Sequence, residues 1–172
     1  MKKYFGILLI TSLICLVQLQ AQTDKTPFLT KSLTGSIKAV KVQTSGGSIT
    51  VEGMTGGESR VEMYVQSNDR HGNLTKEQIQ KKLDEDYTIE ITATNQQLTA
   101  IAKQKNKISN WRNALNISFK VFAPRNISSD LNTSGGSINI SNVSGEQDLK
   151  QAAEPAYRSC YREINGKIPV AH

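Results

Sequence analysis

The sixteen residues from Thr44 to Ser59 read TSGGSITVEGMTGGES, and those from Thr133 to Asp148 read TSGGSINISNVSGEQD. The two copies share T-S-G-G-S-I and a later glycine, which is Gly56 in the first copy and Gly145 in the second. A glycine pair that turns the chain, followed by alternating apolar and polar residues and another glycine turn, is typical of short strands in a stacked, repeating β architecture. The repeat therefore predicts an all-β fold.

The turn residues of both copies are expected to be structural. Glycine adopts the positive φ that a tight corner requires, and the neighbouring Thr and Ser can bond local backbone groups or stack as ladders between coils. No Lys-Ser/Thr pair follows the glycines, so a phosphate-binding loop is not indicated. The expected structural turn residues are Thr44, Ser45, Gly46, Gly47, Gly56, Thr133, Ser134, Gly135, Gly136 and Gly145.

Alternation outside the repeat predicts the other strands. Residues 37–42 and 49–51 are predicted as two strands joined by the first tight turn, and residues 60–66 as a third strand with one polar face. Strand patterning resumes at 87–92, 98–102 and 115–122, with a turn at Asn95-Gln96-Gln97, and residues 127–131 lead into the second T-S-G-G.

Between residues 73 and 86 the apolar period changes from two to four. Thr75 and Gln78 have capping-box spacing, and Leu74 and Ile79 occupy the two positions of a hydrophobic staple. The pattern predicts a short helix inserted into the sheet protein, from about residue 76 to residue 84.

The N-terminus has the pattern of a secretory signal. Lys2 and Lys3 precede an apolar stretch at 5–17, and Leu19-Gln20-Ala21 offers small or neutral residues before a cut. The stretch is shorter than the roughly 20 residues of a spanning helix, and no later segment is apolar enough. We expect a signal peptide at 1–21, a linker at 22–35, one β domain at 36–150 and export to the periplasm, outer surface or extracellular space.

The charge pattern does not indicate nucleic acid as a partner. The formal net charge is +6, and Lys2 and Lys3 account for two of these charges, which leaves +4 on the mature chain. Most Lys and Arg residues alternate with acidic ones, and the denser group at 103–112 falls in a polar, loop-like stretch. We expect Trp111 in that loop to cover the edge of the sheet.

The inventory of catalytic residues is small. The mature chain has two histidines, His71 in a predicted turn and His172, and Cys160 is its single cysteine, so no intramolecular disulfide is expected. No Cys or His spacing typical of zinc occurs, and no acidic calcium loop. We expect no catalytic residues, no metal, no cofactor and no enzymatic activity.

A third copy of the motif is expected but missing. Residues 130–132 read Asp-Leu-Asn before the second T-S-G-G, and 148–150 read Asp-Leu-Lys, yet 151–154 read Gln-Ala-Ala-Glu. Loss of one base in an adenine tract at codon 150 would explain the change, because restoring it regenerates Thr-Ser-Gly-Gly. On this hypothesis the tail 151–172 is aberrant and disordered, and it leaves an uncapped β edge that favours self-association.

Several of these features together resemble a known family. The export signal, the strand-proline segment at 117–124, and T-S-G-G-S-I followed by V-S-G at 143–145 are similar to the bacterial putative-adhesin domain family, formerly a domain of unknown function. The chain looks like its members from the Bacteroidetes over roughly residues 36–150, without further C-terminal coils. The resemblance implies a right-handed β-solenoid or β-roll at the periplasm or cell surface.

Three functions remain open at this stage. The first is a non-enzymatic envelope or cell-surface protein whose repetitive β scaffold has an adhesin-like or structural role, in contact with glycan, matrix or another envelope protein. The second is an accessory protein that regulates an envelope-stress response by protein contact. The third is an envelope hydrolase, which the sparse histidines and absent metal ligands disfavour.

Overall fold

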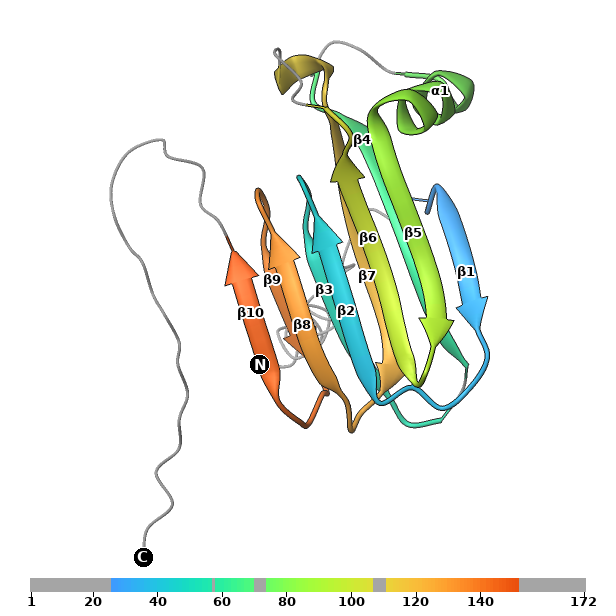
Figure 1. Ribbon diagram of the computed structural model, residues 1–172, viewed down its shortest axis with the longest axis vertical. Coiled ribbons are helices and arrows are strands. Elements are labelled where there is room, and N and C mark those ends of the chain that lie inside the picture. Colours follow the sequence, from blue (N-terminus) through green and yellow to red (C-terminus); the bar gives the residue numbers. More distant parts are fainter. Residues whose placement is uncertain (1–25, 57, 70–73, 107–110, 152–172) are drawn as a thin grey trace, which may run out of the picture.

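Ten strands and one α-helix make up the part of the chain that the computed structural model describes, residues 26–56, 58–69, 74–106 and 111–151 (Figure 1). The strands are β1 (Leu29–Leu33), β2 (Ala39–Thr44), β3 (Ile49–Met54), β4 (Ser59–Ser67), β5 (Tyr87–Thr94), β6 (Gln97–Gln104), β7 (Leu115–Pro124), β8 (Ser128–Thr133), β9 (Ile138–Ser141) and β10 (Gln147–Gln151). The helix α1 spans Lys76–Asp86, and a 3₁₀ turn spans Trp111–Asn113.

The strands form two five-stranded mixed sheets that lie one behind the other (Figure 1). Sheet A has the order β1-β4-β7-β3-β9, and sheet B has the order β10-β8-β2-β6-β5. The pairs β1–β4, β4–β7 and β5–β6 are antiparallel, and the other neighbours are parallel. The predicted all-β class is confirmed, with two sheets that are not closed on each other.

The period of two in the strands places one apolar face of each sheet inside. Val40 and Val42 of β2, Val51 of β3, and Leu98 of β6 are at most 1% exposed, and Phe119 of β7 fills the space between the sheets. Burial of each large apolar side chain contributes about 1.5–3 kcal/mol. This core holds the two sheets together.

The T-S-G-G turn joins two strands that belong to different sheets. The first turn connects β2 of sheet B to β3 of sheet A, and the second connects β8 of sheet B to β9 of sheet A. The predicted tight turns are present, but β2 and β3 do not hydrogen-bond to each other as the strands of a hairpin would. Each turn is therefore a corner between the layers.

The inserted helix begins at the predicted residue. Gln78 N–H donates to Thr75 Oγ1 at 3.3 Å, and Thr75 N–H donates to Gln78 Oε1 at 2.9 Å, so the predicted capping box is confirmed. The helix continues to Asp86, two residues beyond the prediction, and Tyr87 N–H bonds to Leu83 O at its end. Buried Leu83 packs into the core, which attaches α1 beside β5.

The predicted turn between β5 and β6 is also confirmed. Asn95 and Gln96 have φ of 52° and 62°, and Thr94 pairs with Gln97. Two successive positive φ values characterise the type I′ turn, whose twist matches that of an antiparallel hairpin. This hairpin forms the β5 edge of sheet B.

Two expectations about individual segments differ from the structure. Part of the expected linker at 22–35 is strand β1, which pairs with β4 through main-chain hydrogen bonds that sequence alternation alone does not reveal. Trp111, which was expected to cover the sheet edge, lies in the 3₁₀ turn and is 63% exposed. Gln151, the first residue of the tail expected at 151–172, is the last residue of strand β10. The signal peptide, His71, Cys160, His172 and tail residues 152–172 lie outside the described residues.

Candidate binding surfaces

The two T-S-G-G corners lie one on the other. Thr44 of β2 is in register with Thr133 of β8, and Ser134 N–H donates to Thr44 O at 3.2 Å. Gly47 N–H donates to Gly135 O at 2.7 Å, which links the two glycine pairs directly. The structure thus brings the eight T-S-G-G residues together in one ladder, as the sequence predicts for a stacked repeat.

The threonine of each corner is buried and bonds the neighbouring layer of main chain. Thr44 Oγ1 donates to Ile117 O at 2.7 Å, and Thr133 Oγ1 donates to Gly47 O at 2.7 Å. The two threonines are 1% and 0% exposed, so both hydroxyls bond these carbonyls away from water. Ser45 adds a bond from its hydroxyl to Ala102 O at 3.3 Å. The hydroxyls of these side chains thus bond main-chain carbonyls and have a structural role.

Only some of the predicted turn glycines are required by their surroundings. A Cβ on Gly47, whose φ is 123°, would lie 2.3 Å from Ile117 O, and a Cβ on Gly136 would lie 2.3 Å from Gly47 O. Gly145 is similar, at 2.3 Å from Ile127 O with a φ of 130°. Gly56 needs glycine only for its φ of 81°, and Gly135 has no atom within 4 Å of its would-be Cβ.

A further close approach was missed by the sequence reasoning. A Cβ on Gly53 of β3 would lie 1.9 Å from Asn142 O, and Asn142 itself has a φ of 56°. The two residues occupy the same position in the two copies of the repeat, so the alignment of the copies was the signal that could have found this contact. The ladder therefore extends beyond the T-S-G-G residues.

Charged and aromatic side chains gather on the outer face of sheet A. We call this group the sheet A surface, and it was also missed by the sequence reasoning. Cross-strand register places Arg60 of β4 opposite Phe122 of β7, and Glu62 opposite Lys120. The members are Glu52 of β3, Arg60, Glu62 and Tyr64 of β4, and Lys120 and Phe122 of β7.

Cation–π contacts and ion pairs hold the sheet A surface in place. The Arg60 guanidinium lies 3.8 Å from the centre of the Phe122 ring and the Lys120 ammonium 4.6 Å from it, which leaves Phe122 only 6% exposed. Arg60 Nε is 3.0 Å from Glu62 Oε1, and Tyr64 Oη donates to Glu62 Oε2 at 2.7 Å. The polar groups are thus ordered before any partner arrives.

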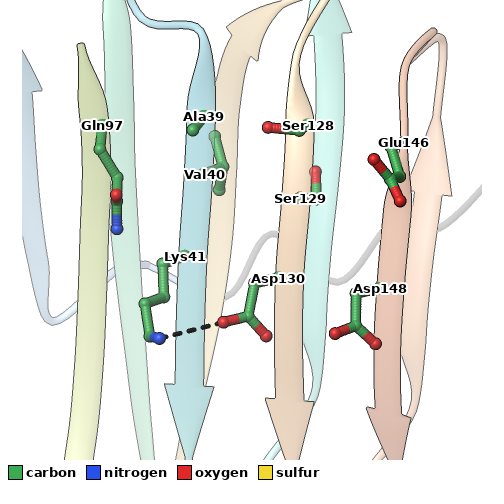
Figure 2. Close-up of a pocket in the computed structure, with 9 residues that line it drawn as sticks. All are labelled: Ala39, Val40, Lys41, Gln97, Ser128, Ser129, Asp130, Glu146 and Asp148. Atoms are coloured by element: carbon green, nitrogen blue, oxygen red, sulfur yellow. Dashed lines mark ion pairs between the residues drawn. The ribbon is translucent and has the colours of Figure 1, made fainter.

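A shallow groove of about 290 Å³ lies on the outer face of sheet B (Figure 2). Lys41, Asp130 and Asp148 stand side by side across β2, β8 and β10, and Lys41 Nζ is 3.0 Å from Asp130 Oδ2. On β10, Lys150 Nζ lies 3.0 Å from Asp148 Oδ2; this hydrogen bond, and then the Asp148 charge, raise the pKa of Lys150. The lining residues are Ala39, Val40, Lys41, Gln97, Ser128, Ser129, Asp130, Glu146 and Asp148.

The described residues offer no built metal site. Within residues 26–56, 58–69, 74–106 and 111–151, no three His, Cys, Asp or Glu side chains gather in a way that could hold a metal ion. Lys41 and Lys150 each pair with one of the groove's aspartates, and the paired Lys41 and Asp130 are 44% and 42% exposed. The groove is a solvated polar surface.

No helix among the described residues is both long and apolar enough to cross a membrane.

Comparisons with known proteins give little further information. No family model matches the chain, and no curated protein matches it. Among solved structures, a putative cell adhesion protein from Clostridium sporogenes has a TM-score of 0.36 and 11% sequence identity, over 65% of this chain and 55% of the other. The chain thus spans about half the length of that protein, and a likeness at this level carries no argument about function.

Proposed function

We propose that the protein is an exported, non-enzymatic envelope or cell-surface protein whose β scaffold presents the sheet A surface to a polar partner. The observation that carries the proposal is the set of ordered charged and aromatic side chains on this surface, centred on Arg60 and Tyr64. Tyr and Arg are enriched at protein interfaces, where they contribute most of the binding energy. The partner classes are glycan, matrix and another envelope protein.

The order of the sheet A surface supports a binding role. When a partner immobilises a long side chain such as Arg, the lost rotamer entropy normally costs about 0.5–1.5 kcal/mol of binding free energy. Arg60 is already held against Phe122 and Glu62 in the free protein, so less of this cost remains to be met on binding. A strand face with side chains held in this way also suits weak contacts that are repeated on a polymer.

We also propose that the fold is a β-roll of the adhesin-like type. The two corner-linked strand pairs, β2–β3 and β8–β9, stack in parallel register as successive coils of a β-roll would. This stacking and the shared T-S-G-G-S-I motif support membership of the adhesin-like family that the sequence resembles. The absence of enzymatic activity is proposed from the small histidine and cysteine inventory of the mature chain.

Binding should depend on the sheet A surface and not on sheet B. Arg60→Ala and Tyr64→Ala are each expected to weaken binding about tenfold or more, because such residues carry the largest share of interface energy. Lys41→Ala is the matched control, since Lys41 is 44% exposed in a 3.0 Å ion pair and Arg60 is 41% exposed in one of the same length. The measurement is sedimentation of the mature chain with purified peptidoglycan sacculi, together with a glycan array.

The outcome separates a glycan partner from a protein partner. Equal losses of binding affinity for Arg60→Ala and Lys41→Ala would contradict a specific role for the sheet A surface. Should no glycan bind, crosslinking in envelope extract is the second measurement. Capture of one envelope protein that is lost with Arg60→Ala supports protein contact through the sheet A surface, which the envelope-protein partner class and the accessory alternative both require.

Export predicts a defined N-terminus for the mature protein. Cleavage after Ala21 leaves Gln22 as the first residue, since Leu19-Gln20-Ala21 supplies the small or neutral residues before the cut. Intact-mass spectrometry of protein recovered from the envelope or medium of the expressing bacterium tests this, with allowance for cyclisation of the N-terminal glutamine. A cytoplasmic protein that retains Lys2 and Lys3 would contradict the proposed location.

A further inference from the structure

Strand β10 is the last strand of sheet B, and among the described residues it has one neighbour, β8 (Figure 1). Its five residues, 147–151, read Gln-Asp-Leu-Lys-Gln. An edge strand exposes a row of main-chain N–H and C=O groups and is a template for pairing with another strand. The question is which strand fits this edge.

The two ends of the paired sheets differ in how well their edge strands are covered. At the β1–β5 end, Lys31 Nζ donates to Ile91 O at 2.6 Å across the sheets, and α1 packs beside β5. At the other end, Leu149 of β10 is 48% exposed, although its register partner Leu131 is 0% exposed. The β10 end thus leaves an apolar residue of the inner face 48% exposed.

The hydrogen bonds between β8 and β10 show which residues of β10 have main-chain groups available for pairing with another strand. Ser129 N–H donates to Glu146 O, and Ser129 is in register with Gln147. In a parallel ladder, successive residues direct their main-chain groups to opposite sides. Residues 146, 148 and 150 therefore face β8, and the N–H and C=O groups of Gln147, Leu149 and Gln151 point to the free edge.

The order of the side chains makes this strand complementary to itself. When two copies run antiparallel with Leu149 opposite Leu149, Asp148 of each copy stands opposite Lys150 of the other. Gln147 then stands opposite Gln151. Residues 147, 149 and 151, whose main-chain groups are free, therefore face each other and can form the hydrogen-bonded pairs of the ladder. We propose that β10 is a dimerisation strand that pairs antiparallel with β10 of a second copy, centred on Leu149.

Charge disfavours the two neighbouring registers in which the free main-chain groups of the two strands still face each other. A shift by two residues in one direction places Asp148 opposite Asp148, and a shift in the other direction places Lys150 opposite Lys150. Like charges directly opposite each other destabilise a strand pair. Charge therefore selects the Leu149-centred register.

Only sheet B becomes continuous across the two-fold axis. Sheet A ends at β9, which pairs with β3, while β10 adds one more strand beyond β8 in sheet B. The contact is confined mainly to one short strand from each copy, well below the size of a stable interface. The dimer is accordingly weak, reversible and dependent on protein concentration, and it does not depend on the proposed function.

Analytical ultracentrifugation of the mature chain, residues 22–172, under reducing conditions tests the proposal, over about 1 to 500 µM protein. Asp148→Lys is expected to weaken dimerisation about tenfold or more, because both cross-strand attractions become repulsions. The double variant Asp148→Lys with Lys150→Asp restores complementarity and should dimerise within about threefold of the original chain. Asp148→Lys should leave the monomer folded, since residue 148 stands opposite Asp130 in register and the ion pair that it loses with Lys150 joins side chains that are 61% and 59% exposed.

Two further variants complete the design. Leu149→Pro removes an N–H that points away from β8, so it should abolish dimerisation while the circular dichroism spectrum is unchanged. Glu90→Lys is the matched control, because it makes the same charge change on β5, the opposite edge strand of sheet B. A monomer at all concentrations, or a double variant as weak as Asp148→Lys, would overturn the proposal.

Discussion

Gly47→Ala is expected to lower the free energy of unfolding by about 3–5 kcal/mol. Two separate causes add up at this residue. A side chain disfavours the φ of 123°, and its Cβ would lie 2.3 Å from Ile117 O, which is main chain and cannot rotate away. The corner would have to move, and the buried bond from Thr133 Oγ1 to Gly47 O would be weakened with it.

Two other glycines separate these causes. Gly56→Ala should cost about 1–2 kcal/mol, since its φ is 81° but no atom lies within 4 Å of the new Cβ. Gly135→Ala should stay within about 0.5 kcal/mol, because it meets no atom within 4 Å and its φ is outside the left-handed region. Urea denaturation of the three variants is the measurement. Equal midpoints for Gly47→Ala and Gly135→Ala would show that the corners are not stacked as described.

The second large effect is expected from Thr133→Val. Valine has nearly the same shape as threonine, but it cannot donate to Gly47 O, which accepts from Thr133 Oγ1 at 2.7 Å in a buried site. Leaving a buried carbonyl without this partner costs about 1–3 kcal/mol. Thr133→Ser keeps the hydroxyl and should therefore lose less stability than Thr133→Val, as measured by the same urea titration.

Thr50→Val provides the control for this prediction. Thr50 is a half-exposed residue on the outer face of β3, where water replaces any lost hydroxyl contact. The change should lie within about 0.5 kcal/mol of the original chain. Thr133→Val with stability as high as that of Thr50→Val would mean that the threonine ladder contributes nothing measurable.

The corner ladder also explains why the edge at β10 is significant. Gln151 is in register with Thr133, which in turn is in register with Thr44, so residue 151 occupies the place of the next ladder threonine. This is the position at which the sequence departs from the repeat. The register therefore supports the interpretation that residues 148–150 begin a third coil, as their similarity to 130–132 predicts.

The site residues divide into those that the sequence predicted and those that it could not. The T-S-G-G corners were predicted because glycine pairs and flanking hydroxyls have strong local preferences. The sheet A surface was not, because it depends on Arg60 of β4 lying opposite Phe122 of β7. These residues are far apart in sequence, and no local pattern encodes which strands become neighbours.

The sequence by itself determined the local elements of this protein. Period-two alternation predicted most of the strands, the capping-box residues Thr75 and Gln78 predicted the start of α1, and the repeated glycines predicted the corners. Each of these depends on φ, ψ and hydrogen bonds within a few residues. Only the tertiary structure decided that the corners join different sheets, that Leu29–Leu33 is a strand, and that Arg60 and Lys120 cover Phe122. Those outcomes depend on the pairing of distant strands, which is decided by the joint burial of both inner faces rather than by any one segment.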